Sequence, residues 1–376
     1  MLKQFMVTAS KKSFAVGIVL LMYAGTTFAQ VTTTAVPFLL IAPNSRASGM
    51  GEAGVALADD GWALYWNPAG LAFQNGSELS LSHANWLPKF NLSDLWIAHA
   101  VYKQQVEEVD GTLAVGMTYL NLGDIVRTGS GGPEPLGTFK SYELALTAGY
   151  ATLLSDDLGI GLNARFIRSA LSQVGTEQEQ GKGVANGFSF DIGMLYKPKS
   201  VPIPFTDYDI GGRINLGFNL SNIGPNLTYI DEAQADALPM TLKLGLAAQV
   251  LDDEYNNLSF IADFSKLLVK KDSAAKYDPF YKAFFSAWTD QSFSRELREF
   301  VIGTGMEYWY GSPKWIGMRV GYFYDEFGPR KFLTFGAGVR YDMYGFDFSY
   351  IAASDQHPLS DTIRFTLLIL WGGASL

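Results

Sequence analysis

The sequence predicts an all-β fold: a transmembrane antiparallel β-barrel of about 14 strands, closed around an N-terminal plug. Three observations predict it. Charged residues make up only 17% of the 376 residues, aromatic residues make up 14%, and there are 39 glycines. Apolar residues alternate with small or polar ones along most of the chain, and the loops between these stretches are short and long in turn. A barrel that faces lipid on its outside and a polar lumen on its inside requires this combination.

Residues 1–29 have the features of a secretory signal peptide. Three lysines flank or precede the apolar stretch 14–25, and small residues lead up to Ala29 at the expected cleavage site. That stretch is shorter than the roughly 20 residues that a spanning helix needs. The chain has no cysteine, so we expect neither a lipid anchor on the mature end nor disulfide bonds. The protein is therefore expected to be exported.

The segment 30–76 differs from the rest of the mature chain. It is rich in glycine, alanine and proline and shows no two-residue alternation. We expect it to form a hatch or plug inside the barrel, with its polar side chains paired to lumen-facing charges. Buried polar groups left unpaired would cost about 1–3 kcal/mol each. The candidate plug residues are Arg46, Asp59, Asp60, Asn67 and Pro68.

The sequence contains no pattern typical of an enzyme, a metal site or a cofactor site. Residues 49–54 read G-x-G-x-x-G, but Pro43 interrupts the preceding apolar stretch and no strand–helix alternation follows. The three histidines lack ligand spacing, and the nucleophile, zinc and phosphate-loop motifs are missing. A net charge of −9 argues against nucleic-acid binding. We expect no catalysis and no cofactor.

The barrel is expected to span residues 77–371, followed by a C-terminal extension over 372–376. In the stretch 141–152, for example, Leu144 and Leu146 alternate with Glu143 and Ala145. The stretches with this pattern are 78–86, 92–102, 112–121, 141–152, 158–166, 187–196, 213–220, 242–250, 258–265, 300–309, 315–322, 333–341, 344–350 and 363–371. The register places charges on the lumen side at Glu143, Arg165, Asp191, Arg213, Lys243, Asp263, Arg319, Arg340 and Arg364.

The loops indicate how the barrel is oriented. The connections 122–138, 170–184, 222–238 and 266–299 are long and polar or glycine-rich. The connections 155–157, 251–256, 311–313 and 342–343 lie between them and are short. Outer-membrane barrels have short periplasmic turns and long outer loops, so we expect the long connections to face the cell exterior.

The longest connection contains an expected short helix over 277–288, with Pro279 in its first turn. Phe280, Phe284 and Trp288 recur at helical spacing and form an apolar stripe. Two interpretations remain open for this stripe. It covers the mouth of the barrel, or it stays exposed and docks a partner protein through its aromatic rings.

Three stretches carry a resemblance to a known family. TTAVPFL (33–39), the run through IAPNSRASGMGEAGVALADD (41–60) to YWNPAGLAF (65–73), and HPLSDTIRFTL (357–367) resemble the PorV family. These are FadL-like outer-membrane barrels of the type IX secretion system of Bacteroidota and their relatives, in which the N-terminal region forms a hatch. Gly70-Leu71 and the residues beyond Trp371 depart from the PorV pattern, which leaves a PorQ-like paralogue open.

The resemblance implies a non-enzymatic shuttle in the outer membrane, in contact with its lipid. Such a protein binds the large translocon barrel and collects secreted proteins through their C-terminal signal domain. It delivers them to a surface attachment complex that contains a sortase. The alternative of a different class is a FadL-like transporter of small hydrophobic molecules, which would need an apolar pocket in the lumen.

Overall fold

The computed structural model describes residues 34–373, except 91–93, 130–131, 174–180, 207, 273–275, 290, 329 and 355–356. The expected signal peptide 1–29 and residues 374–376 of the expected C-terminal extension lie outside the described residues. Within the described part of the chain, no helix is both long enough and apolar enough to cross a membrane.

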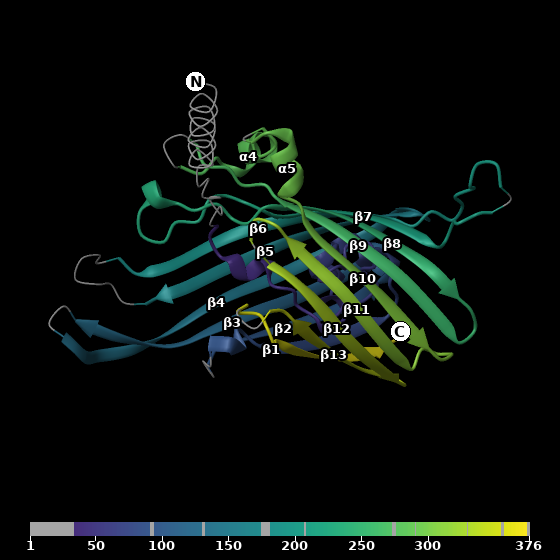
Figure 1. Ribbon diagram of the computed structural model, residues 1–376, viewed down its shortest axis with the longest axis horizontal. Coiled ribbons are helices and arrows are strands. Elements are labelled where there is room, and N and C mark those ends of the chain that lie inside the picture. The colour runs from purple at the N-terminus through teal and green to yellow at the C-terminus, as the bar shows by residue number, and fades with distance from the viewer. Residues whose placement is uncertain are drawn as a thin grey trace, which may run out of the picture. The chain divides into compact units, whose positions relative to one another are not determined.

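The described chain forms one closed antiparallel barrel of 14 strands, in which each strand pairs with its neighbours in sequence and β1 pairs with β14 (Figure 1). The fold predicted from the alternation is therefore confirmed. The strands are β1 Ser77–Asn85, β2 Trp96–Val106, β3 Gly111–Gly129, β4 Gly132–Ser155, β5 Leu158–Ser172, β6 Gly183–Tyr196, β7 Ile214–Ile223, β8 Thr241–Asp252, β9 Asn256–Leu267, β10 Val301–Tyr310, β11 Ile316–Asp325, β12 Arg330–Tyr341, β13 Tyr344–Ala352 and β14 Ile363–Trp371.

The two faces of the strands follow the expected register. In β4, Leu146 on the outer face is 45% exposed, whereas Glu143 on the inner face is 4% exposed. Eight of the nine charges expected in the lumen are buried. The expectation for Arg213 was wrong: this residue precedes β7, is exposed, and donates its backbone N–H to the Ile210 carbonyl in a turn.

One long connection is not a loop. The stretch 122–138 is largely the outer end of the β3–β4 hairpin, where Asp124 pairs with Lys140 and Val126 pairs with Thr138. Its glycines and prolines resemble loop composition, but here they coincide with register shifts within a continuous ladder. The hairpin projects well beyond the barrel wall (Figure 1).

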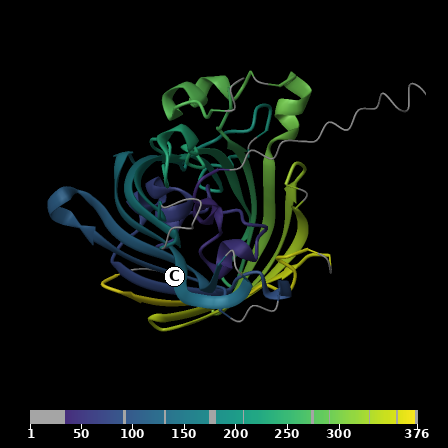
Figure 2. The same ribbon diagram turned by 90° about the vertical axis from the view of Figure 1, so that its left-hand side faces the viewer.

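The remaining elements are short helices. Inside the ring of strands lies the segment 34–76, which we call the plug (Figure 2). It contains η1 Pro37–Leu40, α2 Ser45–Ser48, α3 Ala63–Trp66 and η2 Pro68–Phe73. Outside the ring, α4 Phe280–Ser286 and α5 Phe293–Arg298 lie over the long-loop end of the barrel, and we call residues 277–299 the cap. Single turns also occur at η3 Pro88–Phe90, η4 Glu107–Val109 and η5 Glu232–Gln234.

Candidate functional site

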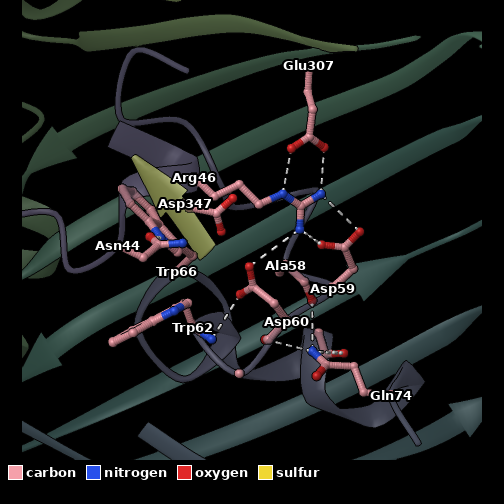
Figure 3. A network of polar contacts seen from close by, with 12 residues as sticks. Asn44, Arg46, Ala58, Asp59, Asp60, Trp62, Trp66, Gln74, Glu307 and Asp347 are labelled. Carbon is pink, nitrogen blue, oxygen red and sulfur yellow. Dashed lines mark hydrogen bonds and ion pairs between the residues drawn. The ribbon is translucent and has the colours of Figure 1, made fainter. Parts of the chain in front are cut away.

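Arg46 links the plug to the barrel wall (Figure 3). Its guanidinium donates from Nε and Nη2 to the two carboxylate oxygens of Glu307 on β10, at 2.8 and 2.7 Å. Its Nη1 donates to Asp59 and, at 3.4 Å, to Asp60. A bidentate pair of this kind fixes direction as well as distance. The plug is thus held to one strand at a defined orientation.

The barrel end of this link is a continuous chain of alternating charges. Arg319 Nε donates to Glu307 at 2.8 Å, and its Nη1 donates to Asp347 at 2.8 Å. Arg340 donates to both oxygens of Asp347 from the other side, at 2.9 and 2.8 Å. All four side chains are buried, so each charge depends on its partners for stabilisation. Arg46 extends this network from the wall into the plug.

The charged candidate residues of the plug differ in where their ion-pair partners lie, in the barrel wall or in the plug itself. Arg46 pairs with a lumen-facing charge, Glu307 of β10. Asp59 and Asp60 instead pair with Arg46 of their own segment, which corrects the expectation that they meet charges of the barrel. Asp60 also accepts the Trp62 backbone N–H at 2.9 Å. Asp60 belongs to the plug and lies outside the spanning strands. Burial raises the pKa of its carboxyl group to about 7, although the positive charge of Arg46 acts to lower that pKa.

Asn67 and Pro68 act through the backbone and through shape. Asn67 Nδ2 donates to the carbonyls of Val55, at 3.0 Å, and of Met194 on β6, at 2.9 Å. Its Oδ1 accepts the Ala69 N–H and so caps η2. Pro68 lies against the wall at Gly161, where a Cβ would come within 2.3 Å of the proline carbonyl carbon.

Polar side chains of several strands hold the rest of the plug backbone. Asp263 of β9 accepts the N–H groups of Gly54 and Val55 at 2.7 and 2.9 Å. Thr366 of β14 accepts the Ser45 N–H at 2.9 Å. Four further contacts to the plug backbone are Gly51 to Thr334, Asn163 to Leu64, Asn219 to Trp66, and Arg364 to Ala42. An irregular segment can be buried because these bonds satisfy its backbone.

The sequence reasoning missed two members of the network, Glu307 and Asp347. The signal that could have found them is the strand register: Glu307 shares its face with Gly303 and Gly305, and Asp347 shares its face with Ser349. Applied to every stretch, the two-residue alternation places both carboxylates in the lumen.

Two small cavities lie between the plug and the wall. One is lined in part by Phe38, Trp62 and His99, the other by Arg46, Asp60 and Arg340. Each has a volume of about 40 Å³. This is room for a few water molecules, whereas pockets that hold drug-sized ligands are roughly 300–1,000 Å³.

The cap differs from its predicted form. Helix α4 begins at Phe280, with Pro279 as its N-cap, and ends at Ser286, so Trp288 lies beyond it. Phe280 and Phe284 pack against a buried cluster at the barrel rim that includes Met240, Leu268, Ala283 and Ala287. On α4 the most exposed rings are those of Tyr281, at 66%, and Phe285, at 72%; on α5 the ring of Phe293 is 79% exposed.

A buried lysine fastens the cap to the barrel. Lys266, at the end of β9, is 1% exposed, and its Nζ donates to Glu296 of α5 at 2.7 Å and to Glu299. The same ammonium group lies 5.4 Å from the centre of the Trp288 ring. Trp288 is 39% exposed, so one part of its ring faces Lys266 while another part is accessible.

Comparison with solved structures places this geometry among outer-membrane barrels. The crystal structure of the P. putida toluene transporter TodX matches with a TM-score of 0.51 at 13% identity, over 87% of this chain and 98% of that chain. A Pseudomonas aeruginosa FadL homologue matches with a TM-score of 0.46 at 13% identity, over 88% and 98%. At this identity, the TodX match supports the expected FadL-like fold and nothing further.

No curated protein matches the sequence. The family model described as "Type IX secretion system protein PorV" matches residues 25–274, which is more than half of the chain. Together with the closed barrel, this match locates the protein in the outer membrane and confirms the resemblance stated from the plug sequence. The chain belongs to the PorV family of type IX secretion system proteins.

Proposed function

We propose that this protein is a non-catalytic shuttle of the type IX secretion system. It binds the translocon barrel, collects secreted proteins through their C-terminal signal domain, and delivers them to the sortase-containing attachment complex at the cell surface. Membership of the PorV family supports this proposal. The finer steps, and the partners that they involve, are what the experiments below test.

The observation that carries the proposal is the filled lumen. The plug is hydrogen-bonded to side chains of β5, β7, β9, β10, β12 and β14. The two cavities described beside it are about seven to 25 times smaller than a pocket for a drug-sized ligand. A barrel that is filled in this way can act through its surface without moving the plug, whereas a transporter of small hydrophobic molecules would have to displace it.

A disulfide between the plug and the wall separates these two functions. Ser45 Oγ lies 3.0 Å from Thr366 Oγ1, and the chain has no native cysteine to interfere. We expect the Ser45→Cys/Thr366→Cys variant to form a bond in the oxidising periplasm. A shuttle with a locked plug should still support secretion of type IX substrates to the normal level. If locking abolishes secretion and reduction restores it, the plug must move and the shuttle proposal is overturned.

The cap supplies a docking surface for the translocon in this proposal. Phe280 and Phe284, two of the three candidate docking residues, pack against the barrel rim and so fit a covering role. The exposed rings of Tyr281 and Phe285 on α4, with the accessible edge of Trp288, form the surface that we assign to the partner. Aromatic side chains dominate the energetics of protein interfaces, and exposed apolar groups of this size mark such sites.

The docking role is tested with two matched double variants. Tyr281→Ser/Phe285→Ser removes exposed rings, whereas Phe280→Leu/Phe284→Leu alters the packed face and keeps it apolar. We expect the first pair to abolish co-purification with the translocon barrel and to leave substrates inside the cell. The second pair should retain co-purification. Normal co-purification and secretion in the first pair would exclude the α4 face of the cap as the docking surface.

A further inference from the structure

The connection between β6 and β7 is longer than the other connections at its end of the barrel. We call its residues 197–206 and 208–213 the β6–β7 ribbon. The ribbon lies beside the short β4–β5 turn, because the Lys197 N–H donates to the Asp157 carbonyl at 2.7 Å and Lys199 pairs with Asp156 at 2.5 Å. The orientation expected for the barrel places this end in the periplasm. In Figure 1 the ribbon rises from the right-hand ends of the two strands and turns away from the barrel axis.

The ribbon is a hydrogen-bonded hairpin with an apolar face. The Ile210 N–H donates to the Val201 carbonyl at 3.1 Å, and the Ile203 N–H donates to the Tyr208 carbonyl at 2.9 Å. In such a ladder, the side chains of paired residues and of residues two apart lie on the same face. One face therefore carries only apolar and aromatic side chains, those of Val201, Ile203, Tyr208 and Ile210. Ile203 is 37% exposed and Tyr208 is 75% exposed.

The opposite face of the ribbon is polar and is held in shape by one carboxylate. Asp209 pairs with Pro202 in the ladder. Its carboxylate accepts from Ser200 Oγ at 2.6 Å and from the N–H groups of Val201 and Gly211, both at 2.7 Å. The ribbon is therefore amphipathic, with one face suited to water and one suited to an apolar phase.

The tip of the ribbon presents a phenylalanine in a conformation that glycine normally supplies. The Thr206 N–H donates to the Ile203 carbonyl at 3.2 Å, which closes a four-residue turn with Pro204 and Phe205 at its centre. Phe205 has a φ of 66°, in the left-handed region that a bulky side chain rarely adopts. Its side chain is fully exposed. Backbone strain that is retained at an exposed aromatic residue points to a use for the ring.

We propose that the β6–β7 ribbon lies in the periplasmic interface of the outer membrane, with its apolar face and Phe205 inserted between the lipids. The argument for lipid is continuity with the lipid-facing surface of the barrel. The outward side chains of β6 are exposed up to its last residue; they are Phe188, Phe190, Ile192, Met194 and Tyr196. The ribbon begins at the next residue and extends this surface. A tyrosine such as Tyr208, with an apolar ring and a polar hydroxyl, is favoured at this depth.

Spin labels can test this placement because the chain has no native cysteine. A label at Ile203→Cys reports on the apolar face, and a label at Pro202→Cys, on the polar face one residue away, is the matched control. The full-length protein is reconstituted without any other protein into vesicles of phosphatidylethanolamine and phosphatidylglycerol. We expect the label at residue 203 to lose most of its collisions with a water-soluble nickel chelate, as measured by electron paramagnetic resonance. The label at residue 202 should keep them.

The Phe205→Gly variant tests the ring itself. Glycine adopts the left-handed conformation of this position without strain, so the turn is preserved while the ring is lost. We expect this change, added to the Ile203→Cys reporter, to restore the collisions with the chelate. A compact band on an unboiled gel verifies that each variant is a folded barrel.

Three results would overturn the inference. Equal exposure of the two labels to the chelate in vesicles excludes insertion of the apolar face. Unchanged collisions after Phe205→Gly show that the ring does not hold the ribbon in lipid. A photoreactive benzoylphenylalanine in place of Phe205 should cross-link lipid in intact cells, and a cross-link to a periplasmic protein instead assigns the ribbon to that protein. None of these results bears on the shuttle function, which the inference does not use.

Discussion

Replacing Arg46 with alanine should loosen the plug by an amount that the structure predicts. Breaking a buried ion pair by removing one partner costs about 3–5 kcal/mol, because the remaining charge is left uncompensated. Here Glu307 keeps Arg319 as a partner at 2.8 Å, and Asp59 is 39% exposed and can be hydrated. The cost should therefore lie at the low end, about 3 kcal/mol. A change of this size raises the population of the undocked plug about a hundredfold.

Conductance in planar lipid bilayers measures that population. We expect Arg46→Ala to open transiently far more often than the wild type, and Arg46→Lys to lie between them, since lysine keeps the charge but cannot bind Glu307 through a bidentate fork. Arg340→Ala is the control: it removes a lumen charge of the same network that pairs with Asp347 and not with the plug. Wild-type conductance in Arg46→Ala, or equal opening in Arg340→Ala, would refute the view that Arg46 holds the plug in place.

Three further predictions concern the packing, the cap and the pH dependence. Gly321→Ala should destabilise the folded barrel by about 1–3 kcal/mol in thermal unfolding, because the new Cβ would lie 2.1 Å from the Gly51 nitrogen. Lys266→Met should remove the ammonium group that bonds Glu296 and Glu299 and so free the cap, so that limited proteolysis cuts residues 280–299 faster while the barrel stays intact. Because the pKa of Asp60 is raised to about 7 in the folded protein, that state binds a proton that the unfolded chain loses above roughly pH 4. Stability from this group therefore falls as the pH rises from about 4 to 7, and Asp60→Asn should unfold with a smaller difference in midpoint between pH 5 and pH 8 than the wild type shows.

The strands could be predicted from the sequence because the alternation of apolar and polar residues indicates both a β-strand and the face, lipid or lumen, on which each side chain lies. That is why Arg165 and Asp191, from different strands, could both be assigned to the lumen, where they form an ion pair at 2.6 Å. The plug has no such alternation. Its polar residues could be recognised as needing partners. The sequence could not assign Asp59 and Asp60 to Arg46, because the direction in which their side chains point depends on irregular turns.

The β3–β4 hairpin and the cap show two other limits. In the outer end of the hairpin, Pro133 and Pro135 indicate a loop when only their immediate neighbours are considered. The structure instead pairs the residues on the two sides of the tip, which extends both strands. In the cap, the stripe that begins with Phe280 was recognisable as apolar, but a helical period cannot distinguish a face that packs on the barrel from one that meets a partner. Only the contact with Met240 and Leu268 decides between them.

The position of the plug has a consequence for biogenesis. The N-terminal segment contacts β5 early in the chain, through Asn163, and β14 at its end, through Thr366. The cylinder closes only when β14 joins β1. To enter a cylinder that had already closed, the plug would have to bring in its tryptophan rings and form its hydrogen bonds to the wall afterwards. We therefore expect the segment to be enclosed while the last strands are still being added, so that the insertion machinery handles an open sheet already wrapped around the plug. Order of synthesis matches this requirement, because the residues to be enclosed emerge before every strand that surrounds them.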